Sequence, residues 1–337
     1  MIRILYILVL SFLVVSCGSD VHINKSQFRG EAFGTTYSII VTDNKSVDLH
    51  FEIDSVIKVV NQSMSTYIPS SDISRINRGD TRVLVDHMFR DVFELSDQIY
   101  QKTGGYFDPT VGVLVNAWGF GPGEKMDLTD MKVDSLMQYV GYSKVKLTED
   151  HHIVKEHPSI YFDFNAIAKG YAIDRLGVAL DQRGLKNYLI EVGGEIVTKG
   201  INTASNKEWV VGIDDPLAED RSNPIRLIQL KDRALASSGN YRKFRVDPET
   251  GVKYVHTINA LTGYTQNSNV LAVSVLADNC ATADGYATAF MAMGLEKTMN
   301  LVQGDSKLEA FVVYLDEDNQ TATWASEGFK SAFLSKE

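Results

Sequence analysis

The sequence predicts an α+β fold, and two features of the chain support this prediction. Segments with the alternating pattern of strands and segments with helical spacing follow one another irregularly, and several neighbouring strands are separated only by short turns. A regular parallel α/β sheet would require strands and helices to alternate strictly. The 337 residues, 44% hydrophobic and 23% charged, suffice for one large domain or two modest ones, and no repeat or low-complexity linker marks a boundary.

The expected helices combine helical spacing of apolar residues with recognisable ends. Residues 87–103 form a clear amphipathic pattern, and the glycines that follow are suited to end it. In chain order we expect helices at residues 49–60, at a short turn capped by Ser71 or Asp72, at 87–103, 135–139 and 166–183, and over 281–290.

The expected strands are short runs rich in β-branched and aromatic residues. Residues 271–276 are almost entirely apolar, which is typical of a buried strand. In chain order we expect strands at residues 33–41, 145–147, 153–155, 160–164, 188–192, 209–211, 225–230, 235–236, 241–246, 271–276, 311–315 and 322–324.

The first residues resemble a bacterial lipoprotein signal. Arg3 precedes an apolar run of about 12 residues, which is too short to span a membrane as a stable helix. The run ends in the sequence VVSC, which resembles a lipobox with Cys17 as the lipidated residue. The alternative is an ordinary signal peptide with a chance cysteine. We therefore expect a signal peptide over residues 1–16, a polar tether over 17–27 and the folded domain over 28–337.

Cysteine content and charge limit the possible partners. Cys280 is the only other cysteine, so lipidation of Cys17 would leave no intramolecular disulfide, and we expect Cys280 to be a buried apolar residue. The net charge of −10 argues against a nucleic acid as the main partner, although a small anion needs only a local site.

The usual catalytic motifs are absent from the sequence. The glycine-rich segment 119–123 neither follows a clear strand nor opens a helix, so it does not match a dinucleotide-binding loop. No P-loop and no GxSxG nucleophile motif occur. His151, His152 and His157 lack the spacing of a zinc site and are expected at the surface.

The segment ATADGYATAF, residues 281–290, carries a carboxylate in an otherwise small and apolar helix. Asp284 and Thr288 lie four positions apart and therefore share one helix face. Carboxylate, hydroxyl and carbonyl oxygens are ligands that suit Mg²⁺, but two side chains are too few to complete its coordination. The alternative is structural: Thr282 caps the helix, and Asp284 is a favourable acid in its first turn.

The segment YFDFNAIAKGYAIDR, residues 161–175, contains a possible phosphate site. Asp163 precedes a predicted helix, and Lys169 lies in the first turn of that helix, where amides and a cation can hold an anion. The alternative is a capped helix start with Lys169 in solvent. Further candidates, each with a structural alternative, are the polar segment 235–244, Asp108 in a glycine-rich loop, the aromatic Tyr67 and His256 before a Thr-Gly turn.

Taken together, the motifs resemble the ApbE family, whose members are FAD:protein FMN transferases. The resemblance rests on FGTTYSI, MSTYIPSSDISRIN, GGYFDPTVGVLVNAWGFG, DFNAIAKGYAIDR, VGGEI, WVVGIDDP, LASSGNY, HTINALTG and ATADGYATAF, which occur in the order of the family and extend from about Phe28 to Leu315. It implies an α+β fold that binds FAD between two sub-parts, with Mg²⁺ at the pyrophosphate.

The resemblance also implies roles for individual residues. Asp284 and Thr288 match metal-binding side chains, and Ala166 and Ala287 match positions that supply backbone oxygens. His256 matches a proposed catalytic base, with Asp163 as the second candidate. The residues that match flavin-nucleotide contacts are Phe33, Tyr67, Tyr106, Phe107, Asp108, Asp163, Lys169 and Ile258.

The chain departs from the family pattern at three places. Phe33 stands where the family usually has Met, and Ser237 replaces a common Thr. Asn259 and Ala260 replace an Asp-Pro pair, which removes a carboxylate and a rigid turn beside His256.

The implied reaction is the Mg²⁺-dependent transfer of FMN from FAD to a Thr or Ser hydroxyl of an acceptor protein, with release of AMP. The expected acceptor is a subunit of a membrane redox pump or an exported flavoprotein, reached by a lipid-anchored enzyme that faces the periplasm or the cell exterior. Two alternatives are an FAD pyrophosphatase that yields FMN and AMP, and a lipoprotein that binds FAD without chemistry.

Overall fold

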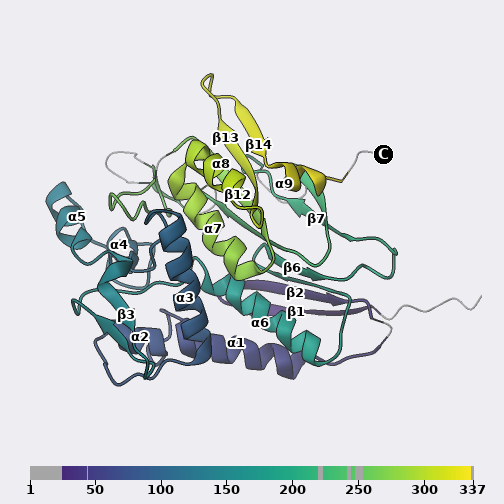
Figure 1. Cartoon of the computed structure of the whole chain (residues 1–337), viewed down its shortest axis with the longest axis horizontal. Helices are drawn as coiled ribbons and strands as arrows, with labels where there is room; N and C mark the ends of the chain where they lie inside the picture. The colour runs from purple at the N-terminus through teal and green to yellow at the C-terminus, as the bar shows by residue number, and fades with distance from the viewer. Residues whose placement is uncertain are drawn as a thin grey trace, which may run out of the picture.

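An antiparallel sheet of eight strands forms the centre of the molecule (Figure 1). The computed structural model describes residues 25–43, 45–218, 223–240, 244–246, 253–266 and 268–334. In spatial order the strands are β1 (Ser26–Ala32), β2 (Thr35–Val41), β5 (Tyr188–Val192), β6 (Glu195–Lys199), β9 (Ala234–Gly239), β12 (Val270–Ala277), β13 (Glu309–Leu315) and β14 (Thr321–Ala325). Every neighbouring pair is antiparallel, which confirms the predicted α+β class.

The first hairpin differs from the expected strand at residues 33–41. Phe33 and Gly34 both have positive φ, 53° and 76°, and form a two-residue turn between β1 and β2. Such turns match the right-handed twist of the flanking strands, and glycine adopts this conformation without steric cost. Phe33 is half-buried, and its side chain packs against two separate clusters of buried apolar residues. β1 begins at Ser26, so the last residues of the predicted tether belong to the sheet.

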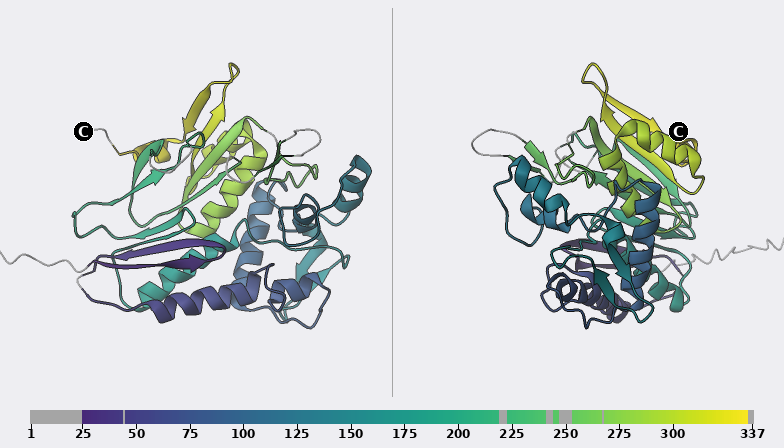
Figure 2. Two further views of the ribbon diagram at one scale, coloured as in Figure 1. Left: turned by 180° about the vertical axis from the view of Figure 1, so that it is seen from behind. Right: turned by 60° about the vertical axis from the view of Figure 1, so that its left-hand side comes forward.

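Two helices cover one face of the large sheet, and further helices pack outside them (Figures 1 and 2). α7 packs on β9 and β12, while α6 packs on β5 and β6 and along α7. α1 packs against α6, and α3 against α7. These helices are α1 (His50–Met64), α3 (His87–Lys102), α6 (Ala168–Gln182) and α7 (Cys280–Met293), and they match the expected helices within four residues at each end.

The opposite face of the sheet is covered by the hairpin of β7 (Trp209–Ile213) and β8 (Arg226–Leu230) and by α9 (Glu327–Ser331). Phe329 of α9 stacks on Phe311 of β13, and both side chains are buried. The sheet therefore has an apolar core on each face. This explains why a central strand such as β12 is apolar at nearly every position.

Smaller elements surround this centre. They are α2 (Asp72–Asn77), α4 (Gly112–Ala117), α5 (Asp130–Met137), the 3₁₀ turn η1 (Tyr142–Lys144), β3 (Val145–Leu147), β4 (Ile153–Lys155), β10 (Phe244–Val246), β11 (Lys253–Val255) and α8 (Leu295–Gly304). Ser71 caps α2 by accepting a hydrogen bond from the Ser74 N–H. Of the two predicted caps, Ser71 and Asp72, the first is therefore confirmed. α5 projects from the body of the molecule (Figure 2).

The expected strand at residues 160–164 is wrong. Only an isolated bridge between Val111 and Tyr161 is formed there. The backbone N–H and C=O of Phe162 bind the side-chain amide of Asn77 instead, at 2.8 and 2.9 Å. Phe162 and Phe164 are nevertheless fully buried beside Phe89, so the apolar pattern reports burial and not a ladder of backbone hydrogen bonds.

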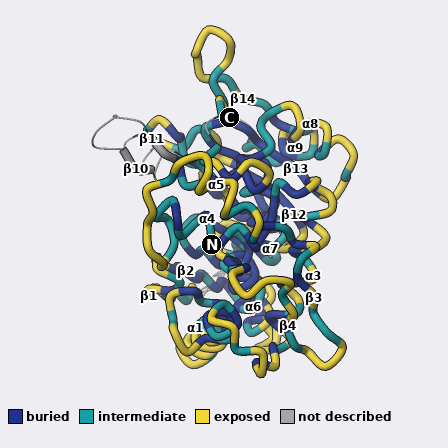
Figure 3. The backbone as a smooth tube through the Cα atoms, turned by 90° about the vertical axis from the view of Figure 1, so that its left-hand side faces the viewer, coloured by how far each residue is buried: buried dark blue, intermediate teal, exposed yellow. Residues whose placement is uncertain are grey.

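Burial is concentrated between the large sheet and its helices, and the exposed residues lie mainly in outer loops (Figure 3). Cys280 is fully buried, as expected. His151 and His157 are exposed and His152 is half-buried, with Nδ1 3.1 Å from the carbonyl oxygen of Val83. In the part of the chain that the structure describes, no helix is long and apolar enough to cross a membrane. The predicted signal peptide and Cys17 lie outside the described residues.

Candidate active site

The candidate site lies where α6 and α7 approach each other at their N-terminal ends. A Cβ atom on Gly170 would lie 2.4 Å from the carbonyl oxygen of Cys280 and 2.8 Å from Cβ of Asp284, so this approach requires glycine. The Gly170 N–H donates a hydrogen bond of 2.9 Å to Oδ2 of Asp284. The two segments singled out in the sequence, 114 residues apart at this contact, therefore meet in one place.

Asp284 is a buried carboxylate with an incomplete set of partners. It is 5% exposed, and burial raises its pKa although Lys169 and the Gly170 N–H act in the opposite direction. Among the described residues no hydrogen bond reaches Oδ1. The alternative structural role for Asp284 is wrong, because the side chain that caps α7 is Asn279 and not Thr282. Asp284 thus lies beyond the first turn of α7.

In the turn before α6, the carbonyl oxygen of Ala166 also lacks a hydrogen-bond donor among the described residues. In a regular helix the Gly170 N–H would bond to the carbonyl of Ala166, four residues earlier. It bonds to Asp284 instead, and within the described residues the Ala166 carbonyl accepts no hydrogen bond. The Ile167 and Ala168 N–H groups both donate to the Phe164 carbonyl, at 3.0 and 2.7 Å, and so fix this turn.

Thr288 lies one turn after Asp284 on α7 and is half-buried. Its Oγ1 is 3.4 Å from Oγ of Ser238 on β9. Ser237, the adjacent residue, bonds instead to Ser274 of β12 at 2.8 Å. β9 keeps a regular register with β12 here, so the polar residues of segment 235–244 that lie in β9 form part of the sheet and not a turn. Ala287, the other predicted metal-site residue of α7, is fully buried.

The half-buried Lys169 forms an ion pair with a buried carboxylate. Its Nζ lies 2.7 Å from Oε2 of Glu195, whose side chain is 5% exposed. The alternative that places Lys169 in solvent is therefore wrong. The neighbourhood holds two carboxylates, Glu195 and Asp284, and one ammonium group, and burial is the main reason that the pKa of Glu195 rises to about 7.

Sequence reasoning did not assign a role to Glu195. The signal that could have found it is its position directly after Gly193 and Gly194, both of which have positive φ in the turn between β5 and β6. A carboxylate at the first position of a central strand is costly to bury without a partner. Its burial therefore predicts a cation nearby, and Lys169 provides it.

Asp163 and Tyr67 lie near each other beside the turn that precedes α6. Asp163 is 8% exposed, burial raises its pKa, and its Oδ1 accepts a hydrogen bond of 2.8 Å from the Asn165 N–H. Tyr67 is 61% exposed, which excludes a role in the core. Partial burial raises the pKa of Tyr67, and the nearby charge of Asp163 raises it further.

The loop between α3 and α4, residues 103–111, lies against α7 and also against Asp163. Near α7, a Cβ atom on Gly285 would lie 3.7 Å from the ring of Phe107 in this loop. Further along the same loop, the Pro109 carbonyl accepts a hydrogen bond of 2.8 Å from the Asp163 N–H. Tyr106, half-buried, accepts a hydrogen bond of 2.8 Å from Nζ of Lys297.

Asp108 holds this loop in shape. Oδ1 accepts hydrogen bonds from the N–H and Oγ1 of Thr110, at 2.8 and 2.6 Å, and Oδ2 accepts one of 3.0 Å from the Tyr142 N–H. The carboxylate is buried, and burial raises its pKa to about 6. Its role as a flavin contact stays a prediction, but these bonds already join two segments of the chain.

Replacing Asp108 by Asn is expected to lower the free energy of unfolding by about 1–3 kcal/mol, because the new NH₂ group would face the buried Tyr142 N–H and leave it without an acceptor. Urea unfolding of the variant and of the parent chain measures the difference. Asp150→Asn, at an exposed carboxylate, is the control and should change it by less than about 0.5 kcal/mol. Equal stability of Asp108→Asn and the parent chain would contradict this role.

The segment with His256 forms a loop beside the end of β9. Asn259, which replaces the acid of the family pattern, accepts a hydrogen bond of 2.9 Å from the Leu261 N–H and donates one of 3.0 Å to Gln266. The turn is thus formed without the Asp-Pro pair. Ile258, 8% exposed, packs into a small core with Leu114.

This loop is fixed at two further points. Thr257 donates a hydrogen bond of 2.8 Å to Oδ1 of Asn240, the residue that follows β9. A Cβ atom on Gly105 would lie 3.1 Å from the side chain of Leu261, so the loop with Tyr106 lies beside the loop with Ile258. The half-buried His256 therefore projects from a segment joined to both β9 and the Tyr106 loop.

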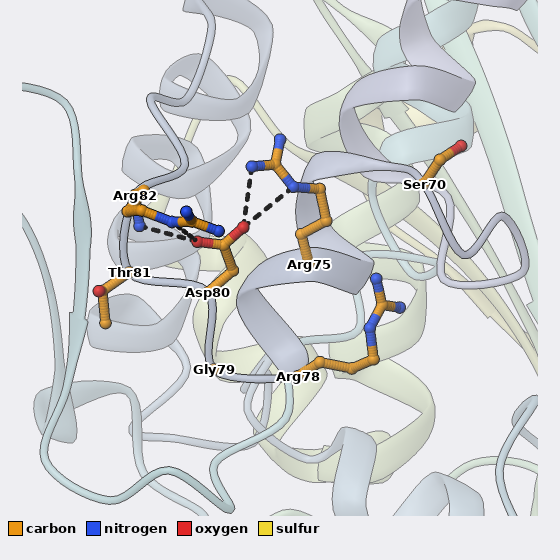
Figure 4. A pocket seen from close by; sticks show the side chains of 7 residues that line it. All are labelled: Ser70, Arg75, Arg78, Gly79, Asp80, Thr81 and Arg82. Atoms are coloured by element: carbon orange, nitrogen blue, oxygen red, sulfur yellow. Dashed lines mark hydrogen bonds and ion pairs between the residues drawn. The ribbon is translucent and has the colours of Figure 1, made fainter.

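An open hollow of about 620 Å³ lies elsewhere, at the end of α2 (Figure 4). Arg75 and Arg82 both bind Asp80, at 2.9 and 3.1 Å, and Arg78 is a third arginine in the lining, so this hollow keeps an excess of positive charge. Arg78 donates a hydrogen bond of 2.7 Å to the Pro69 carbonyl, near Tyr67 in the chain. None of the predicted site residues lines this hollow. In the described part of the chain no group of three or more His, Cys, Asp or Glu is arranged to hold a metal.

The free energy of unfolding of the metal-free protein is expected to fall as the pH rises from about 4.5 to about 7. Burial raises the pKa of Asp108 and Asp174 to about 6 and that of Glu195 to about 7, so the folded state binds more protons than the unfolded chain in this window. Urea unfolding in a chelator should show a decrease of at least about 2 kcal/mol between pH 5 and pH 7. Constant or rising stability across this interval would contradict the burial of these acids.

Comparison with known proteins gives consistent results. The model of the ApbE family matches residues 33–312. An FAD:protein FMN transferase of Vibrio cholerae is 33% identical over 98% of this chain and 99% of its own length, and one of Haemophilus influenzae is 32% identical over 91% of each. A structure titled flavin transferase ApbE from Vibrio cholerae superposes with a TM-score of 0.83, at 33% identity, and covers 93% of this chain and 100% of that one. An ApbE protein of Thermotoga maritima, 27% identical, has a TM-score of 0.81 over 93% of this chain and 100% of its own.

Proposed function

This chain belongs to the ApbE family, and from that membership and the site between α6 and α7 we propose that it transfers FMN from FAD to a hydroxyl group of an acceptor protein. The enzyme is thus a flavin transferase, and FAD is its substrate. The Thr or Ser identity of the acceptor hydroxyl and the requirement for Mg²⁺ are the finer parts of this proposal.

The observation that carries the proposal of Mg²⁺ is the pair of oxygens without hydrogen-bond donors. Among the described residues, Oδ1 of Asp284 and the carbonyl oxygen of Ala166 accept no hydrogen bond, although the Gly170 N–H links the two segments. The two carboxylates, Asp284 and Glu195, outnumber the single ammonium group of Lys169, so the site has an excess of negative charge. Oxygen ligands and this negative charge suit a hard divalent cation. Asp284, Thr288 and the Ala166 and Ala287 carbonyls would hold it, and the substrate phosphates and water would complete its coordination.

Mg²⁺, when bound, supplies positive charge that polarises the pyrophosphate and stabilises the leaving phosphate. Lys169 provides a second positive charge, which Glu195 holds at the first turn of α6. Held in this ion pair, the ammonium group loses little freedom when the substrate binds, so its contribution is mainly to position the phosphates.

The chemistry requires one bond to form and one to break. The oxygen of the acceptor hydroxyl forms a bond to the riboflavin-side phosphorus, and the bond from that phosphorus to the bridging oxygen breaks, with its electron pair leaving on AMP. The hydroxyl proton passes to a general base, for which His256 is the first candidate. Asp163 orients the substrate, or takes the proton if His256 does not reach it.

Aromatic and polar side chains around the site are suited to hold the flavin nucleotide. Phe33, Tyr67 and Tyr106 offer half-buried or exposed rings on which flavin or adenine can stack. The Phe107–Asp108 segment helps to fix the loop that carries Tyr106, and Ile258 helps to fix the loop that carries His256.

The acceptor and the cellular location form a further part of the proposal. The lipobox-like sequence ending at Cys17 supports a lipid anchor, with the catalytic domain facing the periplasm or the cell exterior. An acceptor at that location would be a subunit of a membrane redox pump or an exported flavoprotein.

A single incubation tests the reaction. The purified protein is mixed with FAD, Mg²⁺ and an exported flavoprotein subunit that carries a candidate Thr, and mass spectrometry is used to find FMN on Thr or Ser of that subunit. A parallel incubation without the subunit is analysed by chromatography for FMN and AMP. An adduct supports transfer. Release of FMN and AMP without an adduct would indicate a pyrophosphatase, and intact FAD in both incubations would indicate a binding protein.

A further inference from the structure

Asp174, on α6, is a carboxylate that the proposed reaction does not use. Its Oδ1 accepts a hydrogen bond of 2.7 Å from the Cys280 N–H, and its Oδ2 accepts one of 2.8 Å from the Ala281 N–H. Cys280 and Ala281 are the first two residues of α7. The first N–H groups of a helix have no acceptor within that helix, so a side chain of α6 supplies the acceptors for the start of α7.

The contact between the two helices is reciprocal. The N–H of Gly170, in the first turn of α6, donates to Asp284 of α7, while the first N–H groups of α7 donate to Asp174 of α6. The carbonyl of Cys280 lies directly against Gly170, where a side chain would collide with it. These contacts fix both the distance between the helices and the position of α7 along α6.

We propose that Asp174 is a positioning residue, which fixes where α7 begins relative to α6 and thereby holds Asp284 beside the turn before α6. Asp284 follows Cys280 by about one helical turn, so a shift in the start of α7 moves the Asp284 carboxylate with it. The consequence for metal binding rests on the proposed function. The positioning itself is a property of the metal-free protein.

The cap at Asn279 cannot replace this contact. Its side chain accepts a hydrogen bond of 2.9 Å from the Thr282 N–H, three residues later in the same segment. Asn279 therefore stabilises the first turn of α7 without joining it to α6. Asn279→Ala is for this reason a matched control, since it weakens the start of α7 but leaves the link between the helices in place.

Two substitutions separate positioning from capping. Asp174→Asn keeps the size of the side chain but can accept only one of the two hydrogen bonds, because its NH₂ group is a donor. Asp174→Glu keeps the charge and both acceptor oxygens, so α7 stays capped and the protein folds, but the added methylene displaces the carboxylate. A residue that only caps α7 would tolerate Asp174→Glu.

Hydrogen exchange of the metal-free, full-length protein tests the positioning directly. We expect the Gly170 N–H to exchange at least about tenfold faster in Asp174→Asn and Asp174→Glu than in the parent chain, because its acceptor Asp284 is no longer held in place. In Asn279→Ala the Thr282 N–H should exchange faster and the Gly170 N–H at the parental rate. If Gly170 exchanges at the parental rate in Asp174→Glu, or in a folded Asp174→Asn, the proposal is overturned.

Titration with Mn²⁺, followed by electron paramagnetic resonance, tests the consequence for the cation. We expect affinity to weaken by roughly tenfold in both Asp174 variants, as is typical when a residue that orients a ligand is changed, and by less than about twofold in Asn279→Ala. Equal affinity in the parent chain and both Asp174 variants would overturn the positioning of Asp284. A parent chain that does not bind Mn²⁺, with Gly170 exchange altered as expected, would instead overturn the proposed metal site alone.

Discussion

Replacing Asp284 by Ala is expected to reduce FMN transfer by on the order of a thousandfold and to remove its dependence on Mg²⁺ concentration, because the variant lacks the only carboxylate proposed to hold the cation. The fold should be retained. Loss of the hydrogen bond from the Gly170 N–H costs about 1–3 kcal/mol, and this is partly offset because a charge that burial disfavours is also removed. Transfer is measured by mass spectrometry of the acceptor over a range of Mg²⁺ concentrations.

Asp284→Asn separates the charge from the hydrogen bond. Its side-chain oxygen can still accept from Gly170, so stability should stay near that of the parent chain, while transfer should be lost as in Asp284→Ala. Asp181→Asn is the matched control, because Asp181 is a carboxylate at the opposite end of α6 that pairs with Lys199. Either Asp284 variant retaining parental transfer at limiting Mg²⁺ would exclude this residue as a metal ligand.

The second large effect is expected at His256. Replacing it by Ala should leave FAD binding unchanged and slow transfer by about 10²- to 10⁴-fold, the usual contribution of a general base. FAD affinity is measured by fluorescence quenching, and single-turnover transfer is measured with bound FAD. This pair of measurements separates binding from chemistry.

Thr257→Val is the control for the shape of the His256 loop. It removes the hydrogen bond to Asn240 that joins the loop to the end of β9, but it leaves the imidazole in place. If His256 is the general base, the rate of FMN transfer should fall much more in His256→Ala than in Thr257→Val. Similar losses in both variants, or loss of FAD binding together with transfer in His256→Ala, would indicate that the residue positions the loop. Asp163 would then be the remaining candidate for the base.

Patterns within a short stretch of sequence predicted elements well where the physical signal is itself local. The amphipathic spacing of residues 87–103 and the glycines that follow it correspond to α3 and its end. The cap at Ser71 is likewise a contact between residues three apart. The strand expected at residues 160–164 failed because the backbone of Phe162 binds the side chain of Asn77, 85 residues away in the chain.

For the candidate site, too, local sequence features could be predicted and distant contacts could not. The segments with Asp284 and with Lys169 stood out from the sequence, because a carboxylate in an apolar helix and a cation at a helix start are unusual where they occur. Their structural alternatives could not be rejected from the sequence. The structure rejected them through Asn279, which caps α7, and through Glu195, which pairs with Lys169.

The sequence by itself determined the family, the α+β class and the set of residue types from which the site is built, because ordered motifs, periodicity and helix caps are properties of neighbouring residues. Only the tertiary structure decided that Gly170 donates to Asp284, that Asp174 binds the start of α7 and that Glu195 holds Lys169. The physical reason is the packing of α6 and α7 on one face of the sheet. Their close approach depends on the missing side chain of Gly170, and it joins groups more than a hundred residues apart that no local pattern relates.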